Sequence, residues 1–502
     1  MNRFLLILLL IITTLGTGHA QGTLRGSNLM EYQLGNIPEL TPRYQSSLFD
    51  QLDLSYRYKS FGLDARVEQY YPSFGDDISY TRVSQFKFQY RAEMIDIQVG
   101  NLYESFGRGL LLRTYEIPGS IWETRGYRVR YGFYRDLLGA AVKFNYKNAE
   151  LKLIRGEVLD VTLPPTVSDD TNRRPDLVEG AEASYRLGSQ KVGLIYMRHH
   201  TESQSIVGSD PAQLLSAYYD GVLFENFSLY GELAKSLNDN TDLTDFSDQA
   251  AYAGYVGLSF YFGNLGASLE YKNYHNFSLG AGINDPPTLV KEHSYRLLNR
   301  STHIPVLTDE SGYQVELYYS FEDGSILTFN TSRASNEISE TIQPVFKEYF
   351  LEYQFYPIEK LSIKAFADYA EDPFRGEPHR YAGGSYIDWD HPKLTSSIEF
   401  EYQQIERDAD PAHNYYIAYT LAKPSKFSAS VVLELTTDPF LLVEPSDDFN
   451  AYPAFIGTYR PNTKNTITLF AGKRRGGPAC NSGVCYDVLS FEGVELRLNT
   501  RF

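Results

Sequence analysis

One stretch of the sequence combines closely spaced glycines with charged side chains of both signs. Residues 100–116 read Gly-Asn-Leu-Tyr-Glu-Ser-Phe-Gly-Arg-Gly-Leu-Leu-Leu-Arg-Thr-Tyr-Glu and carry Glu104, Arg108, Arg113 and Glu116. Glycine lets the backbone approach a wall closely, and opposite charges can lie in a confined aqueous space. Two interpretations follow from these residues. They line a constriction that filters solutes, or they form internal salt bridges that only brace the surrounding structure.

A second segment, 275–311, is the longest one without a strand pattern. It contains the cationic or titratable side chains His293, Arg296, Arg300 and His303. Unstructured connections of this length are usually functional or disordered. We therefore consider these four residues a candidate lid. An inward-folded lid and an outward surface loop are both compatible with the sequence.

The other reactive residue types form no catalytic or metal-binding pattern. His199 and His200 are adjacent, so in a strand their side chains would point to opposite faces. No Gly-x-Ser-x-Gly elbow or phosphate-binding loop occurs. Cys480 and Cys485 are predicted to form a short-loop disulfide, because two thiols with no nearby histidine make only half a zinc site. We expect no enzyme activity, no cofactor and no metal.

The N-terminus has the three parts of a secretory signal peptide. Arg3 provides the positive charge, residues 4–15 are mostly apolar, and Gly18-His19-Ala20 is a small-x-small cleavage site. The apolar run is shorter than the approximately 20 residues that span a bilayer, which disfavours the alternative of an N-terminal anchor. Residues 1–20 are therefore predicted to be removed after Ala20 during export.

The composition disfavours several protein classes. The chain has 41 Tyr and 30 Phe among 502 residues and a formal net charge of -17. The mean hydropathy of -0.35 argues against a helical membrane protein. The negative charge argues against nucleic acid as a partner. Tyrosine suits a membrane–water boundary, although an array of soluble β-sandwiches could also be rich in tyrosine.

Apolar and polar residues alternate with a period of two along most of the chain. A clear example is 398–403, where Ile398, Phe400 and Tyr402 alternate with Glu399, Glu401 and Gln403. This pattern is typical of strands that face lipid on one side and water on the other. We predict an all-β protein, a single transmembrane antiparallel β-barrel of the outer membrane with about 24 strands (roughly 22–26).

The predicted strands begin with 48–58, include 125–135 and end with 489–502. The predicted organisation is a signal peptide at 1–20, an N-terminal periplasmic or lumenal segment at 21–47, and a barrel at 48–502 with inserted loops at 102–124 and 275–311. An even strand number would place both termini in the periplasm. Loop 102–124 would then lie on the periplasmic side or fold into the lumen.

The last strand ends in an aromatic residue. Leu496, Leu498 and Phe502 share one face of it, and Arg497 and Arg501 lie on the other. This pattern resembles the signal that the outer-membrane assembly machinery reads. The expected partners are that machinery during biogenesis, outer-membrane lipid and lipopolysaccharide, while the sequence names no other protein partner.

The sequence resembles an uncharacterised family of Bacteroidota outer-membrane proteins. The resemblance is carried by the segment 100–116 and by a second block, Asp-Pro-Pro-Thr-Leu at 285–289 followed by His-Ser-Tyr at 293–295 and Leu-Leu-Asn at 297–299. Downstream of the first block the chain departs from the family, with Ile-Pro-Gly-Ser at 117–120 in place of a more acidic segment. The resemblance implies an outer-membrane barrel and names no substrate.

Two functions remain. The first is a porin-like or loop-gated channel for an unidentified solute, which the charged second face of the strands favours. The alternative is a structural or docking component of an envelope or secretion complex, with a lumen sealed by its own loops. Since no plug domain fits before residue 48, the loops themselves are expected to narrow a lumen of this size.

Overall fold

The computed structural model describes most of the chain. The described residues are 22–72, 78–160, 173–200, 212–237, 242–247, 250–280, 283–304, 309–336, 343–407, 410–438, 448–481 and 484–502. The predicted signal peptide and its cleavage site at Ala20 lie outside them.

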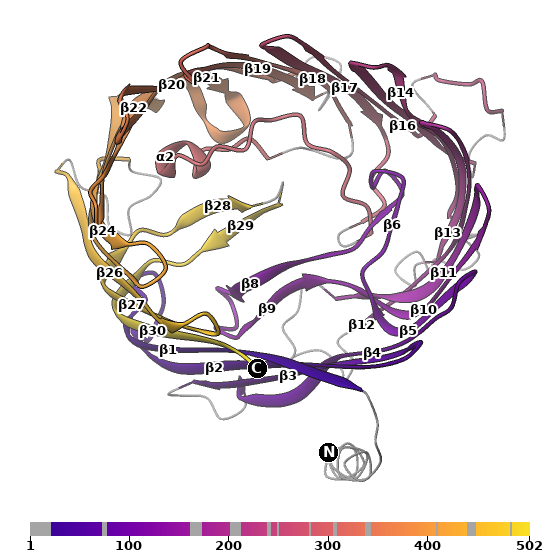
Figure 1. Ribbon diagram of the computed structural model, residues 1–502, viewed down its shortest axis with the longest axis horizontal. Coiled ribbons are helices and arrows are strands. Elements are labelled where there is room, and N and C mark those ends of the chain that lie inside the picture. Colours follow the sequence, from indigo (N-terminus) through magenta and orange to yellow (C-terminus); the bar gives the residue numbers. More distant parts are fainter. Residues whose placement is uncertain are drawn as a thin grey trace.

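The chain forms one closed antiparallel barrel of 24 strands (Figure 1). Each strand pairs with its neighbour in the chain, apart from the connections that skip small inner strands, and β1 pairs with β30 to close the barrel. The barrel strands are β1 (Thr23–Asn36), β2 (Tyr44–Tyr58), β3 (Phe61–Pro72), β4 (Tyr80–Arg91), β5 (Ile95–Leu102), β10 (Leu137–Tyr146), β11 (Ala149–Leu159), β12 (Arg173–Leu187), β13 (Gln190–His200), β14 (Ala212–Phe224), β15 (Phe227–Ser236), β16 (Tyr252–Phe262), β17 (Leu265–His275), β18 (Asp309–Ser320), β19 (Ile326–Asn336), β20 (Val345–Ile358), β21 (Leu361–Asp372), β22 (Glu377–Asp390), β23 (Thr395–Arg407), β24 (Asp410–Lys423), β25 (Phe427–Thr436), β26 (Asn450–Asn462), β27 (Asn465–Arg474) and β30 (Phe491–Arg501).

The remaining elements are short and lie in the connections. They are β6 (Ser105–Phe106), β7 (Leu112–Arg113), β8 (Tyr115–Glu123), β9 (Arg130–Arg135), α2 (Arg296–Asn299), η4 (Pro373–Arg375), β28 (Gly477–Asn481) and β29 (Val484–Val488). Among the described residues, no helix has the length and apolar character needed to cross a membrane.

The two faces of the barrel have opposite chemistry. On β23, the outward side chains of Ile398 and Phe400 are 47% and 43% exposed, whereas Glu401 and Gln403 are buried on the inner face. This arrangement inverts that of a soluble protein, because apolar groups face outward and polar groups face inward. The alternation seen in the sequence thus has its origin in a lipid-facing exterior and a polar interior.

The connections at the two ends of the barrel differ in length. The end that carries both termini has tight turns, such as 147–148, 188–189 and 263–264. The opposite end has the longer connections, among them 103–136, 276–308 and 475–490. Figure 1 shows the described parts of these three segments inside the ring of strands.

The predicted strand number is confirmed, but two of the strand assignments are wrong. One barrel strand was missed and one inner strand was counted as a barrel strand, so the total is unchanged. Residues 21–47 were expected to precede the barrel, whereas β1 is a barrel strand whose register with β30 runs from Ser27 to Asn36. The outward positions of β1 include Gly26 and Asn28. These two residues interrupt the apolar alternation, so the sequence pattern did not predict this strand. Conversely, β9 pairs only with β8, inside the barrel.

The corrected strand order also changes the side from which the first long connection leaves the barrel. Antiparallel neighbours alternate in direction, so counting from β1 places 103–136 at the end opposite the termini. The prediction that it lies on the terminal side is wrong. Its alternative, that the segment folds into the lumen, agrees with the structure.

Candidate functional site

The first insert, residues 103–136, contains the four candidate constriction residues. They do not pair with one another. Glu104 is buried and lies 3.4 Å from Lys143 Nζ and 3.6 Å from Lys152 Nζ on the barrel wall. Its backbone NH lies 2.6 Å from Thr114 Oγ1. Glu104 therefore ties the insert to β10 and β11, which corresponds to a bracing role.

Arg108 lies at the tip of the first insert. Its guanidinium lies 4.0 Å from the centre of the Tyr230 ring, and its Nη1 donates to Tyr255 Oη at 3.3 Å. Its backbone NH donates to Glu232 at 3.1 Å. A guanidinium held over an aromatic face keeps its edge donors free for other groups.

A cavity of about 500 Å³ lies between this tip, the second insert and the wall. Arg108, Arg113, Tyr255, Glu270 and Thr288 are among its lining residues. Arg113 forms an ion pair with Asp285 of the second insert at 3.0 Å. Burial raises the pKa of the Asp285 carboxyl, against the opposing influence of Arg113. Arg108 and Arg113 thus line an internal space, as the constriction hypothesis requires.

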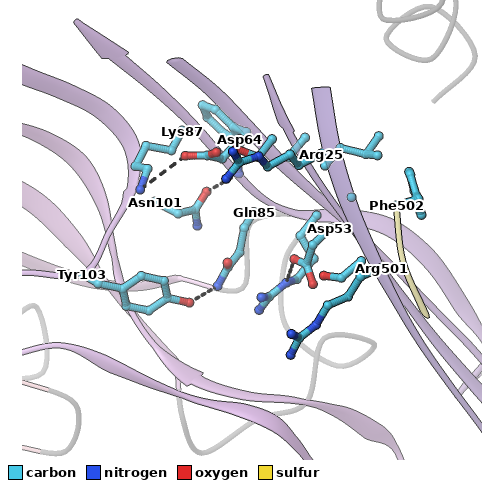
Figure 2. A pocket seen from close by; sticks show the side chains of 16 residues that line it. Arg25, Asp53, Asp64, Gln85, Lys87, Asn101, Tyr103, Arg501 and Phe502 are labelled. Carbon is cyan, nitrogen blue, oxygen red and sulfur yellow. Dashed lines mark hydrogen bonds and ion pairs between the residues drawn. The ribbon is translucent and has the colours of Figure 1, made fainter. Parts of the chain in front are cut away.

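Glu116, the last of the four candidates, pairs with a residue that lines a second cavity. It forms an ion pair with Arg66 of β3 at 2.6 Å, and Arg66 also pairs with Asp53 at 2.6 Å. Arg66 and Asp53 line a cavity of about 450 Å³ at the terminal end of strands β1 to β5. Figure 2 shows this cavity, with Tyr103 of the first insert facing Gln85 of the wall. The first insert therefore contributes lining residues to both cavities.

The second insert comprises the described residues 276–280 and 283–304. It folds inward along the wall, so the inward-lid interpretation agrees with the structure and the surface-loop interpretation does not. His293 Nε2 lies 3.1 Å from Glu348. Arg296 and Arg300 both lie 3.7 Å from Glu434. The four candidate lid residues each contact a carboxylate of the barrel wall, the fourth being His303.

His303 occupies a nearly fully buried position between two carboxylates. Its Nδ1 lies 2.9 Å from Asp372 and its Nε2 lies 3.9 Å from Glu310, while its ring stacks on Phe346. Burial favours the neutral imidazole, but the hydrogen bonds and charges of Asp372 and Glu310 outweigh it and hold the pKa of His303 above its ordinary value. His303 is outside the barrel strands and anchors the end of the second insert.

The third insert, residues 475–490, was not predicted to enter the lumen. It forms the β28–β29 ribbon, in which Cys480 lies directly opposite Cys485. Cys480 is disulfide-bonded, while the side chain of Cys485 lies outside the described residues, so the pairing of these two residues stays a prediction. The Gly476-Gly477 pair and the two cysteines between predicted strands were the only sequence signal for a folded insert.

The three inserts contact one another in a ring. The first and second meet at Arg113 and Asp285, where Arg113 N also donates to Ile283 O at 2.9 Å. The third meets the first where the rings of Tyr486 and Phe133 lie 5.4 Å apart. The second and third meet where Arg300 donates to the carbonyl of Gly476 at 2.7 Å. The three inserts together form a plug made from the barrel's own connections.

Comparison with known proteins identifies a family and several solved structures of low sequence identity. Residues 1–370 match the model of a family of unknown function, DUF6029. The chain belongs to this family. No curated protein matches the sequence.

Solved structures that resemble this DUF6029 member are bacterial barrels of low sequence identity. The P pilus usher translocation pore (PapC) is 11% identical, with a TM-score of 0.45 over 96% of this chain and 99% of that chain. OccK3 (OpdO) of Pseudomonas aeruginosa is 14% identical, with a TM-score of 0.41 over 70% and 92%. The siderophore receptor PirA of Pseudomonas aeruginosa is 10% identical, with a TM-score of 0.49 over 97% and 81%.

Two clusters in this family member have metal-ligand residue types. His293, Glu348 and Asp368 offer ligand atoms within 4.8 Å of one another. Arg380 Nη2 already donates to Glu348 at 2.8 Å and to Asp368 at 3.0 Å, so a guanidinium balances these carboxylates. His199 and His200 approach different carboxylates, Asp176 and Glu179, which agrees with their predicted opposite orientations. Both clusters are explained by ion pairing.

Proposed function

We propose that this protein is a loop-gated channel that carries a small solute across the outer membrane of a Gram-negative, Bacteroidota bacterium. The main observation in support of this function is the plug formed by the three inserts. Three connections enter a 24-strand barrel from one end and contact one another. Beside the first insert they leave charged cavities of about 450 and 500 Å³.

The barrel's exterior supports the proposed location. Its outward-facing apolar side chains, such as Ile398, Phe400 and Leu351, are between 43% and 47% exposed and need a lipid environment. Outer-membrane lipid, lipopolysaccharide and the assembly machinery are the partners we propose. N-terminal sequencing of the mature protein tests export, because cleavage after Ala20 gives a chain that starts at Gln21.

Planar-bilayer recording of the refolded barrel tests the channel. We expect discrete conductance steps, smaller than those of an open barrel with the same number of strands, because the inserts occupy much of the lumen. A bilayer that stays silent with correctly folded protein would contradict the proposal.

The runner-up function is a structural or docking component with a sealed lumen. The ring of contacts among the inserts is the observation that favours it, since each insert contacts the other two. Isolation of the barrel in mild detergent distinguishes the two functions. A stoichiometric protein partner together with absent conductance would support docking, and we propose no enzymatic activity in either case.

A further inference from the structure

The inner wall behind the second insert carries a row of carboxylates. Five strands from β18 to β25 contribute to it, and all six side chains face the barrel interior. These residues are Glu316, Glu348, Glu352, Asp368, Glu401 and Glu434, which together we name the acidic track.

The first part of the acidic track is occupied by side chains of the second insert. Lys291 Nζ forms an ion pair with Glu316, and His293 Nε2 lies 3.1 Å from Glu348. Tyr295 Oη donates to Glu352 at 2.6 Å. Three side chains of the insert therefore each contact a different carboxylate of the wall.

The second part is occupied by the short helix α2 and its flanks. The backbone NH groups of Arg296 and Leu297 donate to the two oxygens of Glu401 at 2.7 and 2.8 Å. The side chains of Arg296 and Arg300 both lie 3.7 Å from Glu434. Five of the six carboxylates of the acidic track, all except Asp368, therefore contact side chains or backbone NH groups of the chain's own insert.

Among the described residues, Arg380 is the one cation of the barrel strands that forms an ion pair with the acidic track. Arg380 of β22 forms ion pairs with both Glu348 and Asp368, while Arg475, the first residue of the third insert, lies 2.5 Å from Glu434. Within the part of the chain that the structure describes, Glu348 Oε2 and Asp368 Oδ2 have no hydrogen-bond donor, although these side chains are only 1% and 5% exposed. Buried carboxylates that lose their partners carry a large free-energy penalty. The acidic track therefore keeps carboxylate oxygens that can accept hydrogen bonds from a cationic ligand.

We propose that the acidic track is a binding surface for cationic solutes with several amino groups, and that the second insert occupies it as a built-in competitor. Linear polyamines have the matching chemistry, because they carry several ammonium groups along a flexible chain, as Lys291, Arg296 and Arg300 are spaced along the insert. The role of the acidic track in transport rests on the proposed channel function, whereas its ability to bind polyamines does not.

Spermine binding to the full-length, detergent-folded protein tests this inference. The triple substitution Lys291→Gln, Arg296→Gln and Arg300→Gln removes three competing cations and keeps the chain length. We expect it to tighten spermine binding about tenfold, measured by isothermal titration calorimetry, because the ligand no longer has to displace three charged side chains of the insert. Adding Glu316→Gln and Glu434→Gln should abolish the gain.

A matched variant controls for the change in net charge. Lys59, Lys147 and Lys464 lie on tight turns at the terminal end, and replacing all three by Gln removes the same charge far from the acidic track. Its spermine affinity should stay that of the wild type. Equal affinities of the triple variant and this control would overturn the inference.

A measurement on the wild-type protein covers the case in which the triple variant does not fold. Millimolar spermine should compete with the insert and raise amide hydrogen exchange across 288–303, with no change in β1. Unchanged exchange would overturn the inference. If the protein binds spermine but gives no current in planar bilayers, the acidic track is a polyamine site and the channel function is contradicted. If the protein conducts but does not bind spermine, the channel function stands and the polyamine site is contradicted.

Discussion

Asn299 and Cys480 exchange two hydrogen bonds across the lumen. Asn299 Nδ2 donates to Cys480 O at 2.9 Å, and Cys480 N donates to Asn299 Oδ1 at 3.0 Å. The side-chain amide of the second insert thus takes the place of a neighbouring strand for the ribbon of the third insert. This pair fixes the positions of two inserts that arise from different parts of the barrel.

Replacement of Asn299 by Ala should loosen the plug without disturbing the barrel. Loss of the amide removes these two hydrogen bonds from the backbone of the buried Cys480, which costs about 1–3 kcal/mol. Hydrogen exchange of 477–488 should rise and barrel strands should stay protected. Asn148→Ala, on an exposed turn, is the control. Protection of 477–488 equal to that of the wild type would show that the pair contributes little.

The attachment of the second insert should depend on pH through His303. Because Asp372 and Glu310 hold its pKa above the ordinary value, the charged imidazole stabilises the folded state. This contribution is fully present below the pKa of the unfolded chain and is lost as the pH rises through the higher folded pKa. Protease sensitivity of the insert should therefore increase on going from mildly acidic to alkaline solution.

The variant His303→Gln isolates that contribution. It should remove most of the pH dependence, because glutamine keeps hydrogen-bonding capacity and carries no proton that titrates in this range. His391→Gln, at a tight turn on the terminal end of the barrel, serves as the matched control. An unchanged pH profile in His303→Gln would assign the dependence to other groups.

Closure of the barrel should be sensitive to a side chain at Gly493. Gly493 lies opposite Gly35 of β1 and Gly472 of β27, and a Cβ there would overlap the carbonyl oxygen of Leu34. Gly493→Ala should separate the strands at the seam, at a cost of about 1–3 kcal/mol. Heat-modifiable migration in SDS gels measures the folded fraction. Gly231→Ala, where a Cβ meets no atom within 4 Å, should fold normally.

Removal of Phe502 should impair assembly and leave export intact. Phe502 N donates to Gly26 O at 2.9 Å and Gly26 N donates to Phe502 O at 3.0 Å, so the terminal residue completes the seam between β30 and β1. We expect the truncated chain to accumulate in the periplasm. Phe502→Tyr keeps the backbone pairing and an aromatic ring, and should assemble. Normal membrane levels of the truncated protein would contradict the prediction for Leu496, Leu498 and Phe502 as an assembly signal.

Arg108 should influence current more than stability. Its guanidinium borders the 500 Å³ cavity, and Arg108→Gln removes that charge while the backbone contact with Glu232 stays. The ratio of anion to cation permeability should fall in planar bilayers. Arg155→Gln, whose side chain is 69% exposed, is the control. Equal permeability ratios in the two variants would place the path elsewhere.

The sequence alone determined the barrel because its signal is local. Whether residue 398 faces lipid and residue 399 faces water depends only on the pleat of the backbone, so a period of two identifies a strand without knowledge of its partners. The pattern failed where local chemistry was mixed. Gly26 and Asn28 interrupt the alternation in β1, so this strand was not predicted. The aromatic residues of β9 gave the pattern of a barrel strand, although the β8–β9 hairpin lies within the lumen.

Only the tertiary structure decided what the charged residues do. Glu104, Arg108, Arg113 and Glu116 were identified from their types, but their partners are Lys152, Tyr230, Asp285 and Arg66, on other strands or on another insert. Asn299 and Cys480 are 181 positions apart in the chain. Closing the sheet brings such groups to face each other across the lumen, and no periodicity along the chain records which side chains will meet there.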